Sequence, residues 1–176
     1  MKIEVAPAAL REKAVLRNLM QLYLYDFSEM LGDDVDDTGL FGYRYLDLYW
    51  AEPGRYPFLI RVDGQVGSKL AGFALVRQAG SLVEEALSPG EVCTHMAEFF
   101  ILRKYRRQGI GAQAAWELFD RFPGRWEVNE IVENPAALAF WRKVIGECTG
   151  GAYEEVFLDN ERWQGPVQVF DSPPRN

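Results

Sequence analysis

The chain has 176 residues, of which 48% are apolar, and a formal net charge of −7 at pH 7. This is enough apolar material for one domain over residues 1–176, and the acidic balance disfavours nucleic-acid binding through a basic face while it suits a cationic small substrate. No stretch approaches the roughly 20 apolar residues of a membrane span, and charges come too early for a secretory signal, so we expect no membrane segment. The two cysteines lie far apart and the chain has a single histidine, which predicts a cytoplasmic protein without a disulfide scaffold or metal site.

The first third of the chain predicts one strand and one long helix. Residues 2–6 alternate as a short strand, and Pro7 leads into a helix over residues 8–31 with an apolar stripe. Tyr23 belongs to this stripe, and packing on the helix face is the favoured interpretation of it. Residues 32–39 are an acidic loop that lacks the spacing of a calcium-binding loop, and residues 40–50 predict a short aromatic helix.

The rest of the chain alternates strands with two helices. The Asp63-Gly64 turn predicts a hairpin of residues 56–62 and 70–78, followed by a polar connection over residues 81–91. We expect a central strand over residues 91–102, a helix over 112–122, and a strand over 126–132. A helix capped by Asn134 with Pro135 at its first position follows, and strands over 153–158 and 167–170 close the domain.

An anion-binding pattern dominates the middle of the sequence. An apolar strand is followed by a basic turn over residues 103–108, by Gly109 and Gly111, and then by an Ala-rich helix. Backbone N–H groups that converge at a helix start, with little side chain in the way, make a site for phosphate.

The two glycines fit other known patterns less well. A P-loop is excluded because Gly111 is followed by Ala112 and Gln113. The dinucleotide fingerprint is matched with Ala114 as its third small residue, but six mostly basic residues separate the strand from the first glycine. A glycine-eased turn with solvated basic side chains would explain the glycines alone.

A second motif lies one strand and one turn downstream. It reads Asn134-x-x-Ala137-x-x-Phe140-Trp141, with a glycine at position 146. Together with the Arg106-x-x-Gly109-x-Gly111 segment, it resembles the two motifs of the GNAT (Gcn5-related) N-acetyltransferase superfamily. The likeness covers about residues 93–146, with one residue inserted before the last glycine and no Phe after it.

The resemblance implies a fold and a reaction. The fold is a single α+β domain with a mixed, mostly antiparallel sheet of six to seven strands and about four helices. The reaction is transfer of an acetyl group from acetyl-CoA to a primary amine, here a small cationic one. In that family the first helices and their loop border the acceptor, so the acidic loop is either solvated or part of a field that attracts ammonium. Dimers are common there, so a homodimer is compatible.

The resemblance also implies which residues hold the cofactor. Backbone amides of Arg107, Gln108, Gly109, Ile110, Gly111 and Ala112 would hold the pyrophosphate, with Arg106 and Arg107 as charge partners. The pantetheine arm would lie along Phe100, Ile101 and Leu102 like an added strand, with an N–H near Ile101 facing the thioester oxygen. Trp141 would wall the thiol end, and Asn134 would add a contact to its capping role.

Proton carriers are less firmly placed by the resemblance. Glu98 and His95 stand where different branches of the family have an acidic residue, and burial beside Phe99 would raise the pKa of Glu98. A strand residue that faces water or an Arg is the equal alternative for Glu98, and a structural role is the favoured one for His95. The family's usual acid is a Tyr at the position of Trp141, whose indole cannot transfer a proton usefully, so Tyr153 or water would substitute.

Two other functions remain compatible with the sequence. Acetylation of a protein N-terminus or lysine would need an open peptide groove. An acyl-CoA-binding module without turnover would explain why the Tyr is missing.

Overall fold

Ten regular elements make up the computed structural model, which describes residues 2–83 and 92–172. The strands are β1 (Ile3–Pro7), β2 (Arg55–Asp63), β3 (Ser68–Ala79), β4 (Cys93–Ile101), β5 (Gly124–Asn129), β6 (Tyr153–Asp159) and β7 (Gln164–Ser172), and the α-helices are α1 (Lys13–Leu31), α2 (Ile110–Arg121) and α3 (Pro135–Thr149). Short 3-10 helices cover Leu10–Glu12, Leu46–Trp50 and Arg103–Tyr105.

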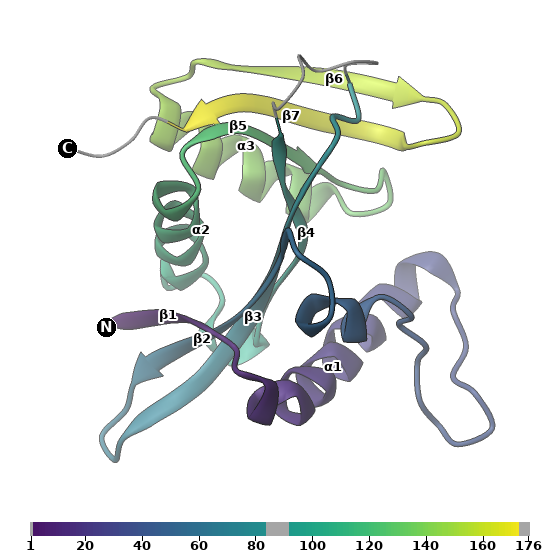
Figure 1. The fold of residues 1–176 in the computed structure, drawn as a ribbon, viewed down its shortest axis with the longest axis vertical. Coiled ribbons are helices and arrows are strands. Elements are labelled where there is room, and N and C mark those ends of the chain that lie inside the picture. Colours follow the sequence, from purple (N-terminus) through teal and green to yellow (C-terminus); the bar gives the residue numbers. More distant parts are fainter. Residues whose placement is uncertain (1, 84–91, 173–176) are drawn as a thin grey trace.

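All seven strands join one mixed sheet in the order β1-β2-β3-β4-β5-β7-β6 (Figure 1). Strands β1 to β4 are antiparallel neighbours, β4 and β5 are parallel, and β5, β7 and β6 are antiparallel again. The predicted α+β class and strand number are therefore confirmed. Three α-helices are present in the described chain rather than about four, because the aromatic segment before β2 forms only the 3-10 helix Leu46–Trp50.

Element ends differ from the predicted ones for local reasons. Helix α2 starts at Ile110, two residues earlier than expected, because Gly109 takes the left-handed conformation that precedes the first turn. The predicted strand over residues 126–132 ends at Asn129, and the last two strands extend beyond their predicted ends. Part of the expected polar connection, residues 84–91, lies outside the described residues.

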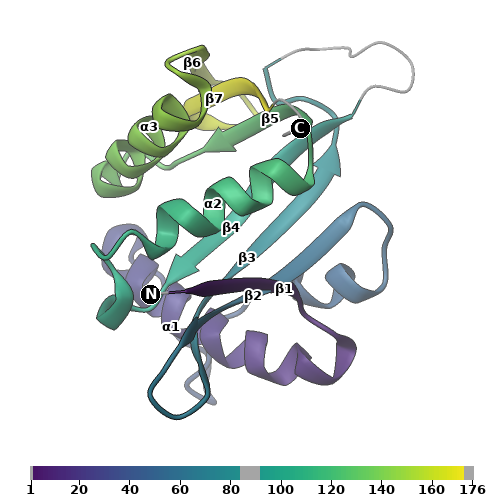
Figure 2. The same ribbon diagram turned by 90° about the vertical axis from the view of Figure 1, so that its left-hand side faces the viewer.

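Two apolar clusters cover the two faces of the sheet. One lies beneath α2 and α3 and includes Trp126, Phe119 and Phe170, and Figure 2 shows α2 crossing the sheet on this side. The other lies beneath α1 and the Leu46–Trp50 helix and includes Phe73 and Phe100. Because β4 contributes side chains to both clusters, its backbone is fixed from both faces. No helix in the described part of the chain is long and apolar enough to cross a bilayer.

Candidate active site

Strands β4 and β5 separate soon after they meet. Only two residue pairs join them, Thr94 with Trp126 and His95 with Glu127. Beyond these pairs β4 continues to Ile101, while the chain after Asn129 turns away into α3. A shift in register against β3 makes Ala97 an extra residue of β4, and such a bulge bends the strand where the separation begins. The result is a gap in the sheet with unpaired backbone groups of β4 along one side.

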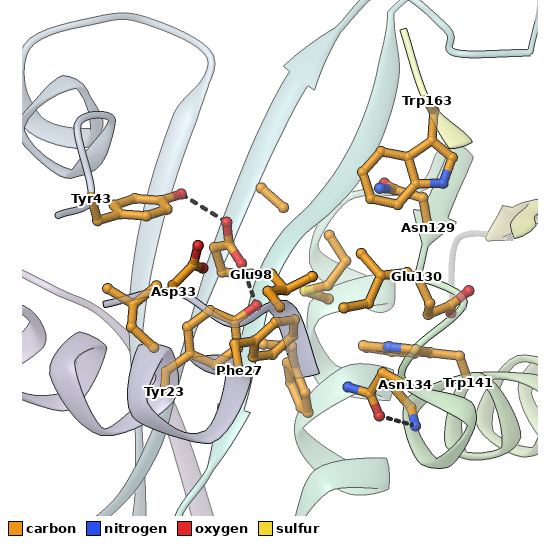
Figure 3. Close-up of a pocket in the computed structure, with 17 residues that line it drawn as sticks. Tyr23, Phe27, Asp33, Tyr43, Glu98, Asn129, Glu130, Asn134, Trp141 and Trp163 are labelled. Carbon is orange, nitrogen blue, oxygen red and sulfur yellow. Dashed lines mark hydrogen bonds between the residues drawn. The ribbon is translucent and has the colours of Figure 1, made fainter. Parts of the chain in front are cut away.

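A cavity of about 330 Å³ lies at this gap (Figure 3). In Figure 3, one side of the cavity is formed by Tyr23, Asp33, Tyr43 and Glu98. The other side is formed by Asn129, Glu130, Asn134, Trp141 and Trp163. Three carboxyl groups line the cavity, and no Lys, Arg or His does so in the described chain. The lining residues are Tyr23, Leu24, Phe27, Leu31, Asp33, Tyr43, Met96, Ala97, Glu98, Phe99, Asn129, Glu130, Ile131, Asn134, Ala137, Trp141 and Trp163.

Glu98 is held by two tyrosine hydroxyls. Tyr23 on α1 donates to Oε2 over 2.5 Å, and Tyr43 donates to Oε1 over 2.9 Å. Burial raises the pKa of Glu98, while the two tyrosine hydrogen bonds and the charge of Arg77 counteract this. The pKa of each tyrosine is raised by burial and by the Glu98 charge, so both stay protonated donors. The alternative in which Glu98 pairs with Arg103 does not occur, because Arg103 binds Asp26 instead.

Glu130 is the second carboxyl group of the cavity and directly follows β5. It is only 5% exposed, and neither of its oxygens has a hydrogen-bond partner among the described residues. Burial raises the pKa of Glu130 to about 8, so the group is largely uncharged at neutral pH. A cation that entered the cavity would favour its ionised form.

The acidic loop contributes one residue to the cavity. Asp33 lines it, while Asp36 accepts hydrogen bonds from the N–H groups of Thr38 and Leu40 and so organises its own loop. The hydroxyl of Thr38, which also donates to Asp36, and these backbone bonds lower the pKa of Asp36. The predicted field that attracts ammonium thus reaches the cavity through Asp33 alone within this loop.

Trp141 and Asn134 form the opposite wall with α3. Trp141 is buried and lies edge-on to Phe99, with ring centres 5.1 Å apart. Asn134 caps α3, since its side-chain oxygen accepts from the N–H of Ala137 over 3.0 Å. The predicted N-cap and the predicted wall therefore both border the cavity.

The loop between β4 and α2 has the backbone of an anion site. Arg107 and Gly109 both have positive φ angles, 59° and 79°, and no side chain caps the start of α2. The first N–H groups of this helix, from Ile110 to Ala112, are therefore left for an external acceptor. Gly111 is packed closely, because a Cβ there would lie 3.2 Å from the ring of Phe140.

Arg106 is already engaged within the protein. Its Nε donates to the carbonyl of Ile101 over 2.7 Å, and its guanidinium binds Asp26 of α1 over 2.6 Å. Gln108 donates to the carbonyl of Lys104. Arg106, the predicted charge partner of the pyrophosphate, therefore also holds this loop against β4 and α1.

The end of β4 presents backbone groups alternately to its two neighbours. The N–H of Leu102 donates to Ala71 on the β3 side, so those of Ile101 and Phe99 face the gap, because successive groups alternate along a strand. Of these two residues, Phe99 lines the cavity, whereas Ile101 lies toward the anion loop. The donor predicted near Ile101 is therefore better matched by the N–H of Phe99.

Two predicted catalytic residues lie outside the cavity lining. His95 is 1% exposed, and its Nε2 hydrogen-bonds the carbonyl of Gly80 over 3.0 Å. Burial and the charge of Arg77 lower its pKa. Tyr153 starts β6 opposite Phe170 and packs against the core below α3. Neither position supports the proton-transfer role that the sequence suggested for these residues.

Sequence reasoning missed several side chains of the cavity. Tyr23 packs in the core from α1 as its place in the helix predicts, but its hydroxyl also binds Glu98, and so does that of Tyr43 from the aromatic segment. Glu130 and Trp163 carried no signal, because their positions depend on how β5, α3 and β7 pack. The alternating charges in residues 126–132 could have indicated Glu130 as a cavity residue only if the end of β5 at Asn129 had been known.

Comparison with known proteins places this geometry in a family. The model of the acetyltransferase (GNAT) family matches residues 16–146, which is most of the chain. The chain belongs to the GNAT acetyltransferase family. It is therefore an acyltransferase that uses acetyl-CoA. A search of curated proteins found no significant match.

Solved structures of this family share the fold at low sequence identity. A GNAT acetyltransferase from Staphylococcus aureus Mu50 is 11% identical with a TM-score of 0.63, covering 97% of this chain and 99% of its own. A spermidine N-acetyltransferase from Vibrio cholerae, solved with CoA and spermine, is 12% identical with a TM-score of 0.60, covering 97% and 95%. The ribosomal-protein-S18-alanine N-acetyltransferase from Escherichia coli is 12% identical with a TM-score of 0.57, covering 99% and 97%.

Proposed function

We propose that this GNAT protein transfers the acetyl group of acetyl-CoA to a primary amine of a small cationic molecule, by direct attack. The observation that supports this acceptor class most is the cavity itself, which is lined by Glu98, Glu130 and Asp33 and by no basic side chain in the described chain. Aromatic rings fill much of the remaining wall and add attraction for a cation.

The cofactor residues fit acetyl-CoA from loop to cavity. The N–H groups at the start of α2 suit the pyrophosphate, because no side chain of the protein caps them. From there the pantetheine arm follows the unpaired edge of β4 toward the bulge at Ala97. Its thioester then lies beside the backbone of Phe99, with the N–H of Phe99 facing the carbonyl oxygen and Trp141 forming the wall of the cavity.

Attack and departure can be balanced without a separate acid. The acceptor ammonium gives one proton to Glu98, and the neutral amine adds to the thioester carbon. The resulting oxyanion is stabilised by the N–H of Phe99, a contribution of about 3–4 kcal/mol for one such donor. When the C–S bond breaks, the nitrogen loses its second proton and the CoA thiolate takes it up, so the Tyr that Trp141 replaces is dispensable.

The experiment is a thiol-release assay with acetyl-CoA and a panel of amines, which includes diamines, aminoglycoside-type amines and peptides with free N-termini. We expect turnover with small cationic amines. Glu98→Gln should lower kcat by about 100-fold or more while the KM for acetyl-CoA changes less than two-fold, because a general base contributes 10²–10⁴. Glu154→Gln, an exposed carboxylate of β6, is the matched control.

Three outcomes would contradict parts of this proposal. A Glu98→Gln enzyme as fast as the parent removes Glu98 from the mechanism. Turnover confined to peptides overturns the small acceptor. Cofactor binding with no thiol release from any amine overturns catalysis.

A further inference from the structure

A second cluster of polar side chains lies on β4 and β5, outside the cavity lining. Cys93 and His95 are two residues apart and so project from the same face of β4. Glu127 is the register partner of His95 on β5. One ligand atom from each of these three buried residues lies within 4.8 Å of the others, and His95 Nδ1 is 3.7 Å from Glu127 Oε2.

The hydrogen bonds around His95 fix which nitrogen carries a proton. Nε2 faces the carbonyl of Gly80, which can only accept, so Nε2 is the donor and Nδ1 of the neutral ring carries a lone pair. Nδ1 has no hydrogen-bond partner among the described residues and faces a carboxylate oxygen, which also offers only lone pairs. Two buried acceptors that face each other need either a shared proton or a metal ion between them.

The donor set indicates the class of that cation. An imidazole nitrogen whose other nitrogen donates to a backbone carbonyl is the usual arrangement of a metal-bound histidine. The Glu127 carboxylate is likewise oriented, by Ser81 and by the N–H of Leu82 at 2.7 Å. With the Cys93 thiolate, the three ligands carry two negative charges, which a divalent ion neutralises in a buried site.

We propose that Cys93, His95 and Glu127 bind one zinc-like divalent metal ion, with a water molecule as its fourth ligand. Binding forms bonds to Cys93 Sγ, His95 Nδ1 and a Glu127 oxygen and releases the thiol proton to solvent. Tetrahedral zinc needs ligand atoms about 3.3–3.8 Å apart, so the observed spread requires only a small contraction. This site is independent of the acceptor proposed above.

The position suggests a structural role. The ion would join β4 to β5 at the two residue pairs where the strands still meet, just before they separate. It would thereby fix the position at which β4 and β5 begin to separate. Binding to the folded state alone raises stability in proportion to the logarithm of metal concentration over Kd.

The test uses the full chain, stripped of metal with a chelator and titrated with Co²⁺ and then Zn²⁺. We expect one equivalent of Co²⁺ to give tetrahedral d–d bands and a thiolate-to-cobalt charge-transfer band, which Zn²⁺ displaces. Cys93→Ser should abolish the charge-transfer band and weaken binding at least tenfold. Cys148→Ser, which changes the other cysteine, should leave both unchanged. Zn²⁺ should raise the Tm of the parent and of Cys148→Ser only.

The wild-type titration alone can overturn the proposal. Absence of a saturable one-equivalent signal, or a charge-transfer band that depends on Cys148, contradicts the site even if Cys93→Ser fails to fold. His95→Asn provides a second variant, which should retain a weakened thiolate band. If His95 of the parent protein keeps a proton and does not bind Co²⁺ in this titration, His95 and Glu127 share a proton and the metal site is wrong.

Discussion

A carboxylate that takes a proton from an ammonium group must be ionised although it is largely removed from water. For Glu98, the base proposed above, Tyr23 and Tyr43 each donate a hydrogen bond to one of its oxygens and so favour the ionised form. Burial raises the pKa of Glu98 and the two hydrogen bonds hold that rise in check. The basicity of this group is therefore set by two residues that lie 75 and 55 positions away in the sequence.

Removing one of these donors should shift the pH dependence of the reaction. In Tyr43→Phe the carboxylate loses a hydrogen bond that lowers its pKa, so the pKa of Glu98 rises further. Because Glu98 acts in its ionised form, the acid limb of the kcat/KM profile should move to higher pH, and activity at low pH should fall several-fold more than at high pH.

The measurement is the pH profile of kcat/KM for the parent and for Tyr43→Phe. Tyr45→Phe is the matched control, because that hydroxyl accepts from Arg44 at the surface. An acid limb that stays in place, or that moves to lower pH, would show that Tyr43 does not tune Glu98.

At the scale of elements, the loop between β4 and α2 has the main-chain geometry of an anion site. Gly109 has a φ of 79°, and a Cβ there would make only an ordinary contact, 3.6 Å from Nε2 of Gln113, so a side chain at this position has room to reach toward the anion site. The uncapped start of α2 supplies the N–H groups and the positive end of the helix dipole.

Gly109→Glu should weaken acetyl-CoA binding at least tenfold, because its carboxylate lies against the diphosphate. Gly67→Glu is the control, since Gly67 in the turn before β3 has a similar φ of 65° and open space. Both variants carry comparable backbone strain of about 1–2 kcal/mol. Calorimetry of acetyl-CoA binding should separate them, and equal affinities would exclude Gly109 from the cofactor site.

At the scale of the whole molecule, α1 connects the cavity to the cofactor loop. Tyr23 binds Glu98, and one turn later Asp26 binds both Arg103 and Arg106 over 2.6 Å. Although burial raises the pKa of Asp26, the hydrogen bonds from Arg106 and Arg103 outweigh it and lower the pKa below 3.8. This ion pair therefore stabilises the packing of α1 against the end of β4.

Asp26→Asn should lower the free energy of unfolding by about 1 kcal/mol at pH 7, a value that allows for the exposure of both arginines. A carboxyl group whose pKa is lower in the folded state contributes its stability above the unfolded pKa and loses it as pH falls through the folded one. The difference between parent and variant should therefore begin to shrink as pH falls below 3.8 and should be smaller at pH 3 than at pH 7.

Urea unfolding at pH 7 and at pH 3 tests this dependence. Asp47→Asn is the control, because Asp47 forms a more exposed pair with Lys13 and should change stability less. A difference between parent and Asp26→Asn that is as large at pH 3 as at pH 7 would mean that packing, rather than charge, carries the effect.

The sequence by itself determined what depends on neighbours along the chain. Gly109 and Gly111 after a basic turn, and Asn134 before Pro135, have fixed spacing, so the anion loop and the capped helix could be predicted together with the α+β fold. The early start of α2 was missed because a single left-handed residue decides it.

Only the tertiary structure decided which distant side chains meet. Tyr43 binds Glu98, Glu130 lines the cavity, and His95 lies outside it beside Glu127. These positions follow from the bulge at Ala97 and from the parallel pairing of β4 with β5 over just two residue pairs. One residue of register moves every side chain of a strand to the opposite face, and no local pattern sets the register between β4 and β5. The acceptor cavity and the Cys93–His95–Glu127 cluster both follow from that register.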